Sequence, residues 1–241
     1  MNKAEFENYI KGFVKDIKRE FDKNFKNKLK GIIGDSMIRG NNPTLSNIVE
    51  DRFAQLLYTI YLEKNYLYLI DVSFSTKLHG ESKSIRPDIV VIERKSNKIE
   101  AIFELKIDDA RADDNWVEQS QAKLKRLKDI SKNEDKEKNY IHYTTIKINN
   151  NGEPMKTRTG RFSNTIHNIS CSQNAKLACI TLCKENSRKK ANSEVFRSSG
   201  EFAMYLSNKH FNNKNHTLQD LLDEKNLNTV QLYDLLIQMN L

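Results

Sequence analysis

The sequence contains few of the residues that build disulfide frameworks, zinc sites or long flexible linkers. Its 241 residues include only three cysteines, three prolines and eight glycines. Cys171, Cys179 and Cys183 are odd in number and lack CxxC spacing, so we expect reduced thiols. Cys179 and Cys183 lie in an apolar run, which predicts that both are core residues.

Long hydrophobic runs are also absent. No segment approaches the roughly 18 consecutive apolar residues that suggest a transmembrane helix, and residues 1–21 carry too many charges for a signal peptide. We therefore expect a cytoplasmic protein without a membrane partner. The chain also lacks the GxxxxGK[ST] pattern of a P-loop ATPase.

The chain has an excess of positive charge. It contains 40 lysines and arginines against 32 aspartates and glutamates, which gives a formal net charge of +8 and a pI near 9.2. This excess favours a polyanionic partner such as a nucleic acid. The length suits one domain of substantial size.

Residues 86–107, RPDIVVIERKSNKIEAIFELKI, are typical of a β-hairpin. A β-branched run at residues 89–92 is followed by a polar turn at residues 93–98 and a second apolar run at residues 99–107. Polar turn residues between two runs of this kind predict two antiparallel strands.

Glu104 and Lys106 interrupt the second apolar run. Residues two apart on a strand share a face, so these two charges point the same way, while Ala101, Phe103, Leu105 and Ile107 share the other face. Antiparallel pairing would bring Asp88 near both charges. Burial of unpaired charge is costly. A metal ion bound at an active site would explain why these charges are tolerated in the strand. The alternative is a surface hairpin with an ion pair between Glu104 and Lys106.

Pro87-Asp88, followed by Glu104-Leu105-Lys106, resembles the motif of the PD-(D/E)XK nuclease superfamily, which includes many type II restriction endonucleases. The resemblance covers about Asn47 to Arg126. It implies an α/β (mixed α+β) fold with a restriction-endonuclease-like αβββαβ core, in which helices flank a central mixed sheet. We accordingly expect a single nuclease domain over residues 1–241, with an N-terminal helical extension (1–43), a catalytic core (44–190) and C-terminal helices (191–241).

The resemblance also implies roles for individual residues. Asp88 and Glu104 would hold one or two Mg²⁺ ions together with the main-chain carbonyl of Leu105, and Lys106 would orient or polarise the attacking water. Members of the superfamily often carry a glutamate on the helix before the sheet, and Glu50, on a predicted helix at residues 45–62, matches that position. The alternative for Glu50 is a capping or edge glutamate that pairs with a lysine.

The implied activity is Mg²⁺-dependent hydrolysis of DNA phosphodiester bonds, by a type II restriction endonuclease or a related defence nuclease. A double-strand cutter needs two active sites, so we expect a homodimer on double-stranded DNA. The alternative is a non-catalytic nucleic-acid-binding protein that retains the fold. A polar loop at residues 150–164 carries three basic residues that could contact phosphates: Lys156, Arg158 and Arg161. The alternative is an ordinary solvated loop, which would have the same composition.

The remaining pattern predicts further elements, some with candidate polar residues. We expect strands at residues 66–75, 140–149 and 177–183, a polar loop at 78–84 with His79, and a helix from Ser198 or Ser199. A helix at residues 115–131 carries Gln119 and Gln121, either of which could help to order the site. The acidic residues at 108, 109, 113 and 114 suit the N-terminus of that helix better than a metal cluster. Two helices within residues 218–241 could cap the core or form a dimer face.

Overall fold

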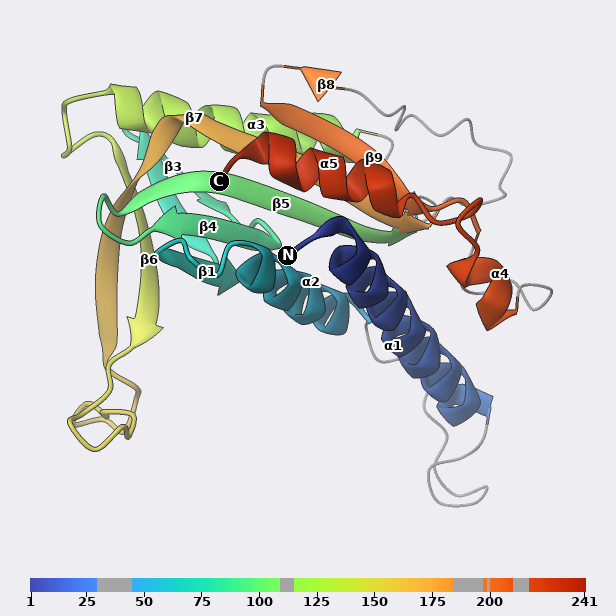
Figure 1. Ribbon diagram of the computed structural model, residues 1–241. Helices are drawn as coiled ribbons and strands as arrows, with labels where there is room; N and C mark the ends of the chain where they lie inside the picture. Colours follow the sequence, from blue (N-terminus) through green and yellow to red (C-terminus); the bar gives the residue numbers. More distant parts are fainter. Residues whose placement is uncertain (30–44, 109–114, 184–196, 199, 210–216) are drawn as a thin grey trace.

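A computed structural model describes residues 1–29, 45–108, 115–183, 197–198, 200–209 and 217–241. Helices cover both faces of a mixed nine-stranded sheet (Figure 1). The helices are α1 (Lys3–Leu29), α2 (Ser46–Ile60), α3 (Trp116–Lys132), α4 (Leu218–Leu222) and α5 (Thr229–Met239). The strands are β1 (Tyr66–Ile70), β2 (Phe74–Leu78), β3 (Glu81–Ile85), β4 (Ile89–Glu93), β5 (Lys98–Asp108), β6 (Tyr140–Ile146), β7 (Asn164–Cys183), β8 (Arg197–Ser198) and β9 (Glu201–Ser207).

The sheet follows the order β1-β4-β5-β7-β6-β2-β3, and β9 pairs with β7 off this path. The strands β1, β4 and β5 pair antiparallel, whereas β5, β7 and β9 run parallel. A parallel neighbour needs a long crossover, and α3 lies in the chain segment that makes it. The result is a mixed α/β sheet.

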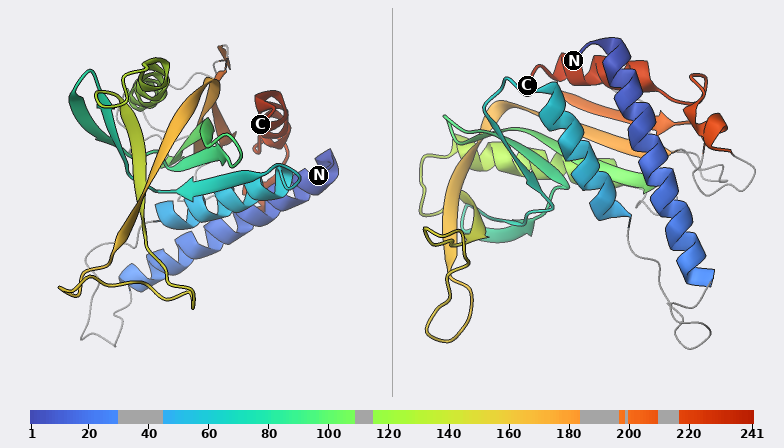
Figure 2. Two further views of the ribbon diagram at one scale, coloured as in Figure 1. Left: turned by 90° about the vertical axis from the view of Figure 1, so that its left-hand side faces the viewer. Right: turned by 60° about the horizontal axis from the view of Figure 1, so that its bottom comes forward.

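Strand β7 joins two parts of the sheet because it is much longer than its neighbours. Residues 164–169 pair with β6, and residues 177–183 lie between β5 and β9. Figure 2 shows β7 running from the lower end of the molecule into the centre of the sheet. The part of the sheet formed by β2, β3 and β6 therefore turns toward the face that α3 covers.

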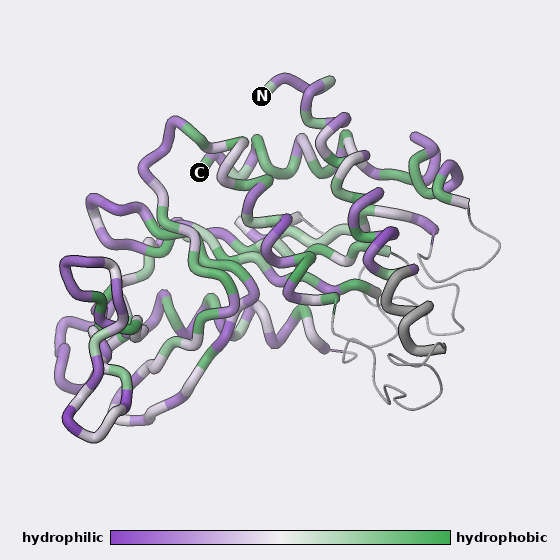
Figure 3. The backbone as a smooth tube through the Cα atoms, turned by 90° about the horizontal axis from the view of Figure 1, so that it is seen from below, coloured by the Kyte–Doolittle hydropathy of each residue, from purple (hydrophilic) through white to green (hydrophobic). Residues whose placement is uncertain are grey.

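Two hydrophobic cores form on the two faces of the central strands. The first contains buried residues of α1, α2 and α5 together with Ala101, Phe103 and Leu105 of β5. The second contains residues of α3 and of β2 and β6, together with Ile102 of β5. Hydrophobic residues concentrate accordingly in the central strands (Figure 3). The predicted division of β5 into two faces is confirmed.

Several predicted elements are confirmed. The hairpin at residues 86–107 forms, with Ile89 paired to Phe103 and Glu93 paired to Lys98. The helices predicted at residues 45–62 and 115–131 appear as α2 and α3. Their buried faces carry the expected apolar residues, including Phe53 and Leu127. The three cysteines form no disulfide, as predicted, and the predicted core positions of Cys179 and Cys183 are confirmed.

The single strand predicted at residues 66–75 is wrong, because the chain divides there into β1 and β2. Asp71 has a φ of 54°, a left-handed conformation that aspartate tolerates better than most residues. The polar loop predicted at residues 78–84 is mostly strand β3, joined to β2 by a turn at His79 and Gly80. Four of the five β3 residues are exposed, so this edge strand gives no apolar signal.

The helix predicted from Ser198 or Ser199 is also wrong. Residues 201–207 form β9, which pairs in parallel with β7. Parallel strands buried on both faces show no apolar–polar alternation, so Phe202, Tyr205 and Leu206 mimic helical spacing. The sheet thus extends beyond the expected core boundary at residue 190 and into the segment expected to be helical, 191–241. The strand predicted at residues 177–183 covers only the buried end of β7.

The C-terminal helix α5 packs onto the first core. Leu232, Leu235, Leu236 and Met239 are all buried in it, and the hydroxyl of Tyr61 donates to the carbonyl of Leu236 at 2.6 Å. The predicted pair of C-terminal helices is confirmed, and α5 caps the core. Among the residues described, no helix is long and apolar enough to cross a membrane.

Neighbouring residues of α5 allow a test of this packing. Leu236 is fully buried and Ile237 is 52% exposed. We expect Leu236→Ala to lower the free energy of unfolding by about 2–5 kcal/mol, because it leaves a cavity in the first core. Ile237→Ala is the matched control and should change it by less than about 0.5 kcal/mol. Urea unfolding measures both; equal effects would mean that α5 does not cap the core as described.

Candidate active site

Asp88 lies immediately before β4, and its side chain is fixed against β5. Its carboxylate Oδ2 accepts a hydrogen bond from the backbone N–H of Leu105 at 2.6 Å. The backbone N–H of Asp71 donates to the carbonyl of Asp88 at 2.8 Å. These two bonds place the Asp88 carboxylate beside the segment that contains Glu104 and Lys106.

Glu104 is buried in the middle of the sheet, with 2% of its surface exposed. Burial raises the pKa of its carboxyl group, Lys123 opposes this shift, and the nearby Asp88 carboxylate adds to it. The Nζ of Lys123, on α3, lies 2.6 Å from Glu104 Oε1 and also donates to the carbonyl of Arg86 at 3.3 Å. The alternative of a surface hairpin is therefore wrong, because β5 is central and the ion-pair partner of Glu104 is Lys123.

Lys106 follows Glu104 on the α3 side of β5. Its ammonium nitrogen lies 5.7 Å from the centre of the Trp116 ring, an arrangement in which the ring face attracts the cation. On the adjacent strand β7, Thr181 pairs with Lys106, and its buried Oγ1 has no hydrogen-bond partner among the described residues. Buried polar atoms usually have such a partner, so this hydroxyl is available to a ligand or a water.

Glu50 lies on α2 and is 7% exposed. Burial, followed by the charges of Asp88 and Asp71, raises the pKa of Glu50 to about 7, and Lys106 opposes the shift. Its Oε2 is buried with no hydrogen-bond partner in the described part of the chain. No described lysine forms an ion pair with it, so the alternative of a lysine-paired edge glutamate is wrong.

Sequence reasoning did not include three residues that complete this cluster. The guanidinium of Arg86 forms an ion pair with the Asp71 carboxylate and also donates to the Asp71 carbonyl. Lys123 neutralises Glu104. Lys123 could have been found from its spacing, because it lies four residues before the apolar Leu127 and so shares the packed face of α3. Asp71 could not, because its role depends on the chain reversal between β1 and β2.

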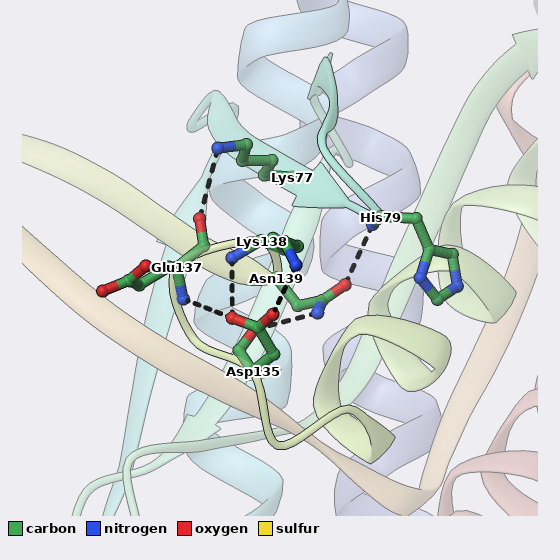
Figure 4. Close-up of polar contacts among 6 residues, drawn as sticks. All are labelled: Lys77, His79, Asp135, Glu137, Lys138 and Asn139. Carbon is green, nitrogen blue, oxygen red and sulfur yellow. Dashed lines mark hydrogen bonds and ion pairs between the residues drawn. The ribbon is translucent and has the colours of Figure 1, made fainter.

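Other candidate residues do not join the cluster. The side-chain amide of Gln119 donates to Asn115, and that of Gln121 donates to Glu201 at 2.8 Å. His79 lies in the β2–β3 turn, where its backbone N–H donates to Asn139 and its ring makes no drawn contact (Figure 4). Asn139 and Asp135 instead fix the loop between α3 and β6. The basic residues of the 150–164 loop lie on the exposed connection between β6 and β7.

The acidic cluster after β5 lies largely outside this description. Asp109, Asp113 and Asp114 are not among the described residues, and neither is the basic segment at residues 188–190. The choice between a helix N-terminus and a metal cluster for the acidic group therefore stays a prediction.

The residue types of the cluster suit a divalent cation, but the present distances between their side chains do not bring three of them to one ion. Asp88, Glu104 and Glu50 supply carboxylate oxygens, the ligand type that Mg²⁺ prefers. Burial, together with the negative charge of Asp88, raises the pKa of both Glu50 and Glu104. The partnerless Glu50 Oε2 points to a missing positive group. However, no three acidic, histidine or cysteine side chains of the described residues are close enough to hold one ion together. Binding of one ion by all three carboxylates together would therefore require side-chain movement.

The raised pKa of Glu50 predicts a pH-dependent stability in metal-free buffer. Between about pH 4.5 and 7 the unfolded chain ionises Glu50 while the folded chain keeps it protonated. The free energy of unfolding should therefore fall as the pH rises through this window, by up to about 3 kcal/mol. Glu50→Gln removes this dependence, so the variant should exceed the wild type in stability at pH 8 but match it near pH 4.

Urea unfolding in EDTA at several pH values measures this difference. Glu63→Gln, at an exposed glutamate beyond the end of α2, is the control and should keep the wild-type pH profile. If the Glu50→Gln profile also follows the wild type, Glu50 is not buried among the acidic groups as described.

Comparison with known proteins assigns the chain to no family. No protein-family model, curated protein sequence or solved structure matches it. Function must therefore be inferred from the side chains of the cluster and their geometry.

Proposed function

We propose that this protein is a Mg²⁺-dependent endodeoxyribonuclease, as the resemblance to the PD-(D/E)XK superfamily implies. The observation that carries the proposal is the meeting of Asp88, Glu104 and Lys106 at one end of the β4–β5 hairpin, where the neighbouring strand residues are buried and apolar. Glu50 approaches the same place from α2, with one carboxylate oxygen unpartnered.

The order of elements around the cluster is a second support. The chain passes through α2, β1, β4, β5, α3 and β7, which is a helix, three antiparallel strands, a helix and a parallel strand. This order agrees with the αβββαβ core that the resemblance implies. The β2–β3 hairpin and β6 are insertions in that order.

The proposed reaction is hydrolysis of a phosphodiester, whose negative charge repels nucleophiles. A bound divalent cation would supply charge neutralisation and a water of lowered pKa. Asp88, Glu104 and the main-chain carbonyl of Leu105 would hold it, with Glu50 in support. Asp88 is pre-positioned for this role by its bond to the Leu105 N–H.

Two lysines have different tasks in this scheme. Lys106 would orient the attacking water and stabilise the charge that develops on the phosphate oxygens. Lys123 neutralises the buried Glu104 carboxylate when no metal is bound, which makes the ionised form tolerable inside the sheet. With a cation held at Glu104, the ammonium group of Lys123 would no longer be needed to neutralise that carboxylate.

The favoured biological role is that of a type II restriction endonuclease or a related defence nuclease, acting as a homodimer on double-stranded DNA. Two observations favour the alternative of a nucleic-acid-binding protein without catalysis. Lys123 already satisfies Glu104, and no preformed metal group exists among the described residues. Metal-dependent turnover separates the two.

Cleavage assays with Asp88→Asn and Lys106→Ala test the nuclease. With Mg²⁺, the wild type should cleave plasmid and unmethylated phage DNA, and EDTA should prevent cleavage. Each variant should lose at least about 100-fold in rate, because one removes a ligand and the other the cation beside the attacking water. Both should keep the wild-type circular dichroism spectrum.

Asp51→Asn is the matched control, since Asp51 is an exposed carboxylate next to Glu50 on α2. It should cleave at the wild-type rate. Discrete fragments would indicate a site-specific endonuclease, and a smear would indicate a less specific defence nuclease. A wild-type rate in either site variant would contradict the assignment; a mobility shift of intact DNA would support the binding protein.

A further inference from the structure

The paired ends of β6 and β7 project from the body of the molecule as a two-stranded ribbon, visible in Figures 1 and 2. We call residues 144–166 the arm. Thr144 pairs with Ile166 and Ile146 pairs with Asn164, and the chain between them forms the tip. Nearly every residue of the arm is exposed, and none belongs to either hydrophobic core. The arm is therefore built for something other than core packing.

Backbone hydrogen bonds within the arm order its tip. The N–H of Met155 donates to the carbonyl of Lys147, and the N–H of Ser163 donates to the carbonyl of Met155, both at 2.8 Å. Two tight turns connect these segments, and each uses a glycine with positive φ, Gly152 at 80° and Gly160 at 77°. A tip that is already ordered loses less conformational entropy when it binds a partner.

The arm carries a local excess of positive charge. Lys147, Lys156, Arg158 and Arg161 are all exposed, and Glu153 is the sole carboxylate of the segment. Four cations less one carboxylate give a net charge of +3. None of the four cations forms an ion pair with a described residue, so all four can meet an external anion.

Apolar side chains are interleaved with these cations. Of the eleven large hydrophobic side chains that are exposed among the described residues, five lie on the arm: Ile146, Ile148, Met155, Phe162 and Ile166. Ile166 lies opposite Thr144, and Thr144 and Ile146 are two residues apart on β6. Ile146 and Ile166 therefore share one face of the ribbon. The Lys156 ammonium lies 5.8 Å from the centre of the Phe162 ring. Exposed apolar groups gathered in this way mark an interaction site.

We propose that the arm is the element that binds duplex DNA, lying in the major groove with its cations on phosphates and its apolar side chains against the groove. Two strands about 4.8 Å apart fit a groove about 12 Å wide. A second copy of the chain is a poor occupant, because two arms of charge +3 repel each other. The inference rests on the proposed function only for its partner, DNA, and uses none of the cleavage residues.

Binding of a fluorescent DNA duplex in EDTA, followed by anisotropy between about 50 and 200 mM salt, tests the cations. The triple variant Lys156→Gln, Arg158→Gln and Arg161→Gln should bind at least about 30-fold more weakly. The slope of log affinity against log salt should become shallower by nearly 3, since each lost phosphate contact removes about 0.9.

The matched control is Lys83→Gln, Lys95→Gln and Lys98→Gln, which removes the same charge from exposed lysines outside the arm. It should weaken binding less than about 3-fold, as expected for a long-range charge effect. Equal losses in the two triple variants would overturn the inference, and so would equal wild-type affinity for duplex and single-stranded DNA.

The apolar residues have a separate readout. Ile148→Ser with Phe162→Ser should weaken binding without changing the salt slope, because no charge is lost. Val230→Ser with Ile237→Ser, at exposed positions of α5, is the control and should leave the affinity unchanged. If the arm variant instead changes the molar mass by light scattering and keeps its affinity, the arm binds a second copy and the inference is overturned.

The two proposals fail in different ways. If the wild type binds duplex through the arm but cleaves no DNA with Mg²⁺, the arm stands and the nuclease assignment falls. If the wild type cleaves DNA and the arm triple variant cleaves it with unchanged KM, the nuclease stands and the arm inference falls.

Discussion

The structure depends on the burial of β5 between β4 and β7, with each face of the strand in a different hydrophobic core. One face packs Phe103 and Leu105 against α2, and the other packs Ile102 toward α3. Glu104 lies on the second face and cannot reach bulk water, so its charge must be balanced from within the protein. Lys123 supplies that balance from α3. The position of α3 on the sheet is thereby linked to the ionisation of a candidate catalytic group.

The burial of charged groups also distinguishes the site from the rest of the sheet. Burial, followed by the charges of Asp88 and Asp71, raises the pKa of Glu50 to about 7. Asp88 is held by a single strong bond to β5, while Glu50 Oε2 has no partner among the described residues. An arrangement of negative groups that is only partly neutralised favours cation binding over a purely structural role.

Strand β7 connects this site to the arm. Its buried half lies beside β5, and Thr181 faces Lys106 across the strand pair; its exposed half forms one side of the arm. A single continuous strand therefore carries a hydrophobic sequence at one end and a polar one at the other. If both proposals hold, the buried end supports the chemistry and the exposed end holds the DNA.

The sequence by itself determined the features that depend on local patterns. It predicted the β4–β5 hairpin, the helices α2 and α3, and the shared face of Glu104 and Lys106, because apolar periodicity reports burial directly. Tertiary structure alone decided the rest. The change of strand partner at Asp71, the sheet strand β9 and the pairing of Lys123 with Glu104 all depend on contacts between distant segments. Such contacts leave no periodic signal in the chain, since they depend on which distant segments pack together.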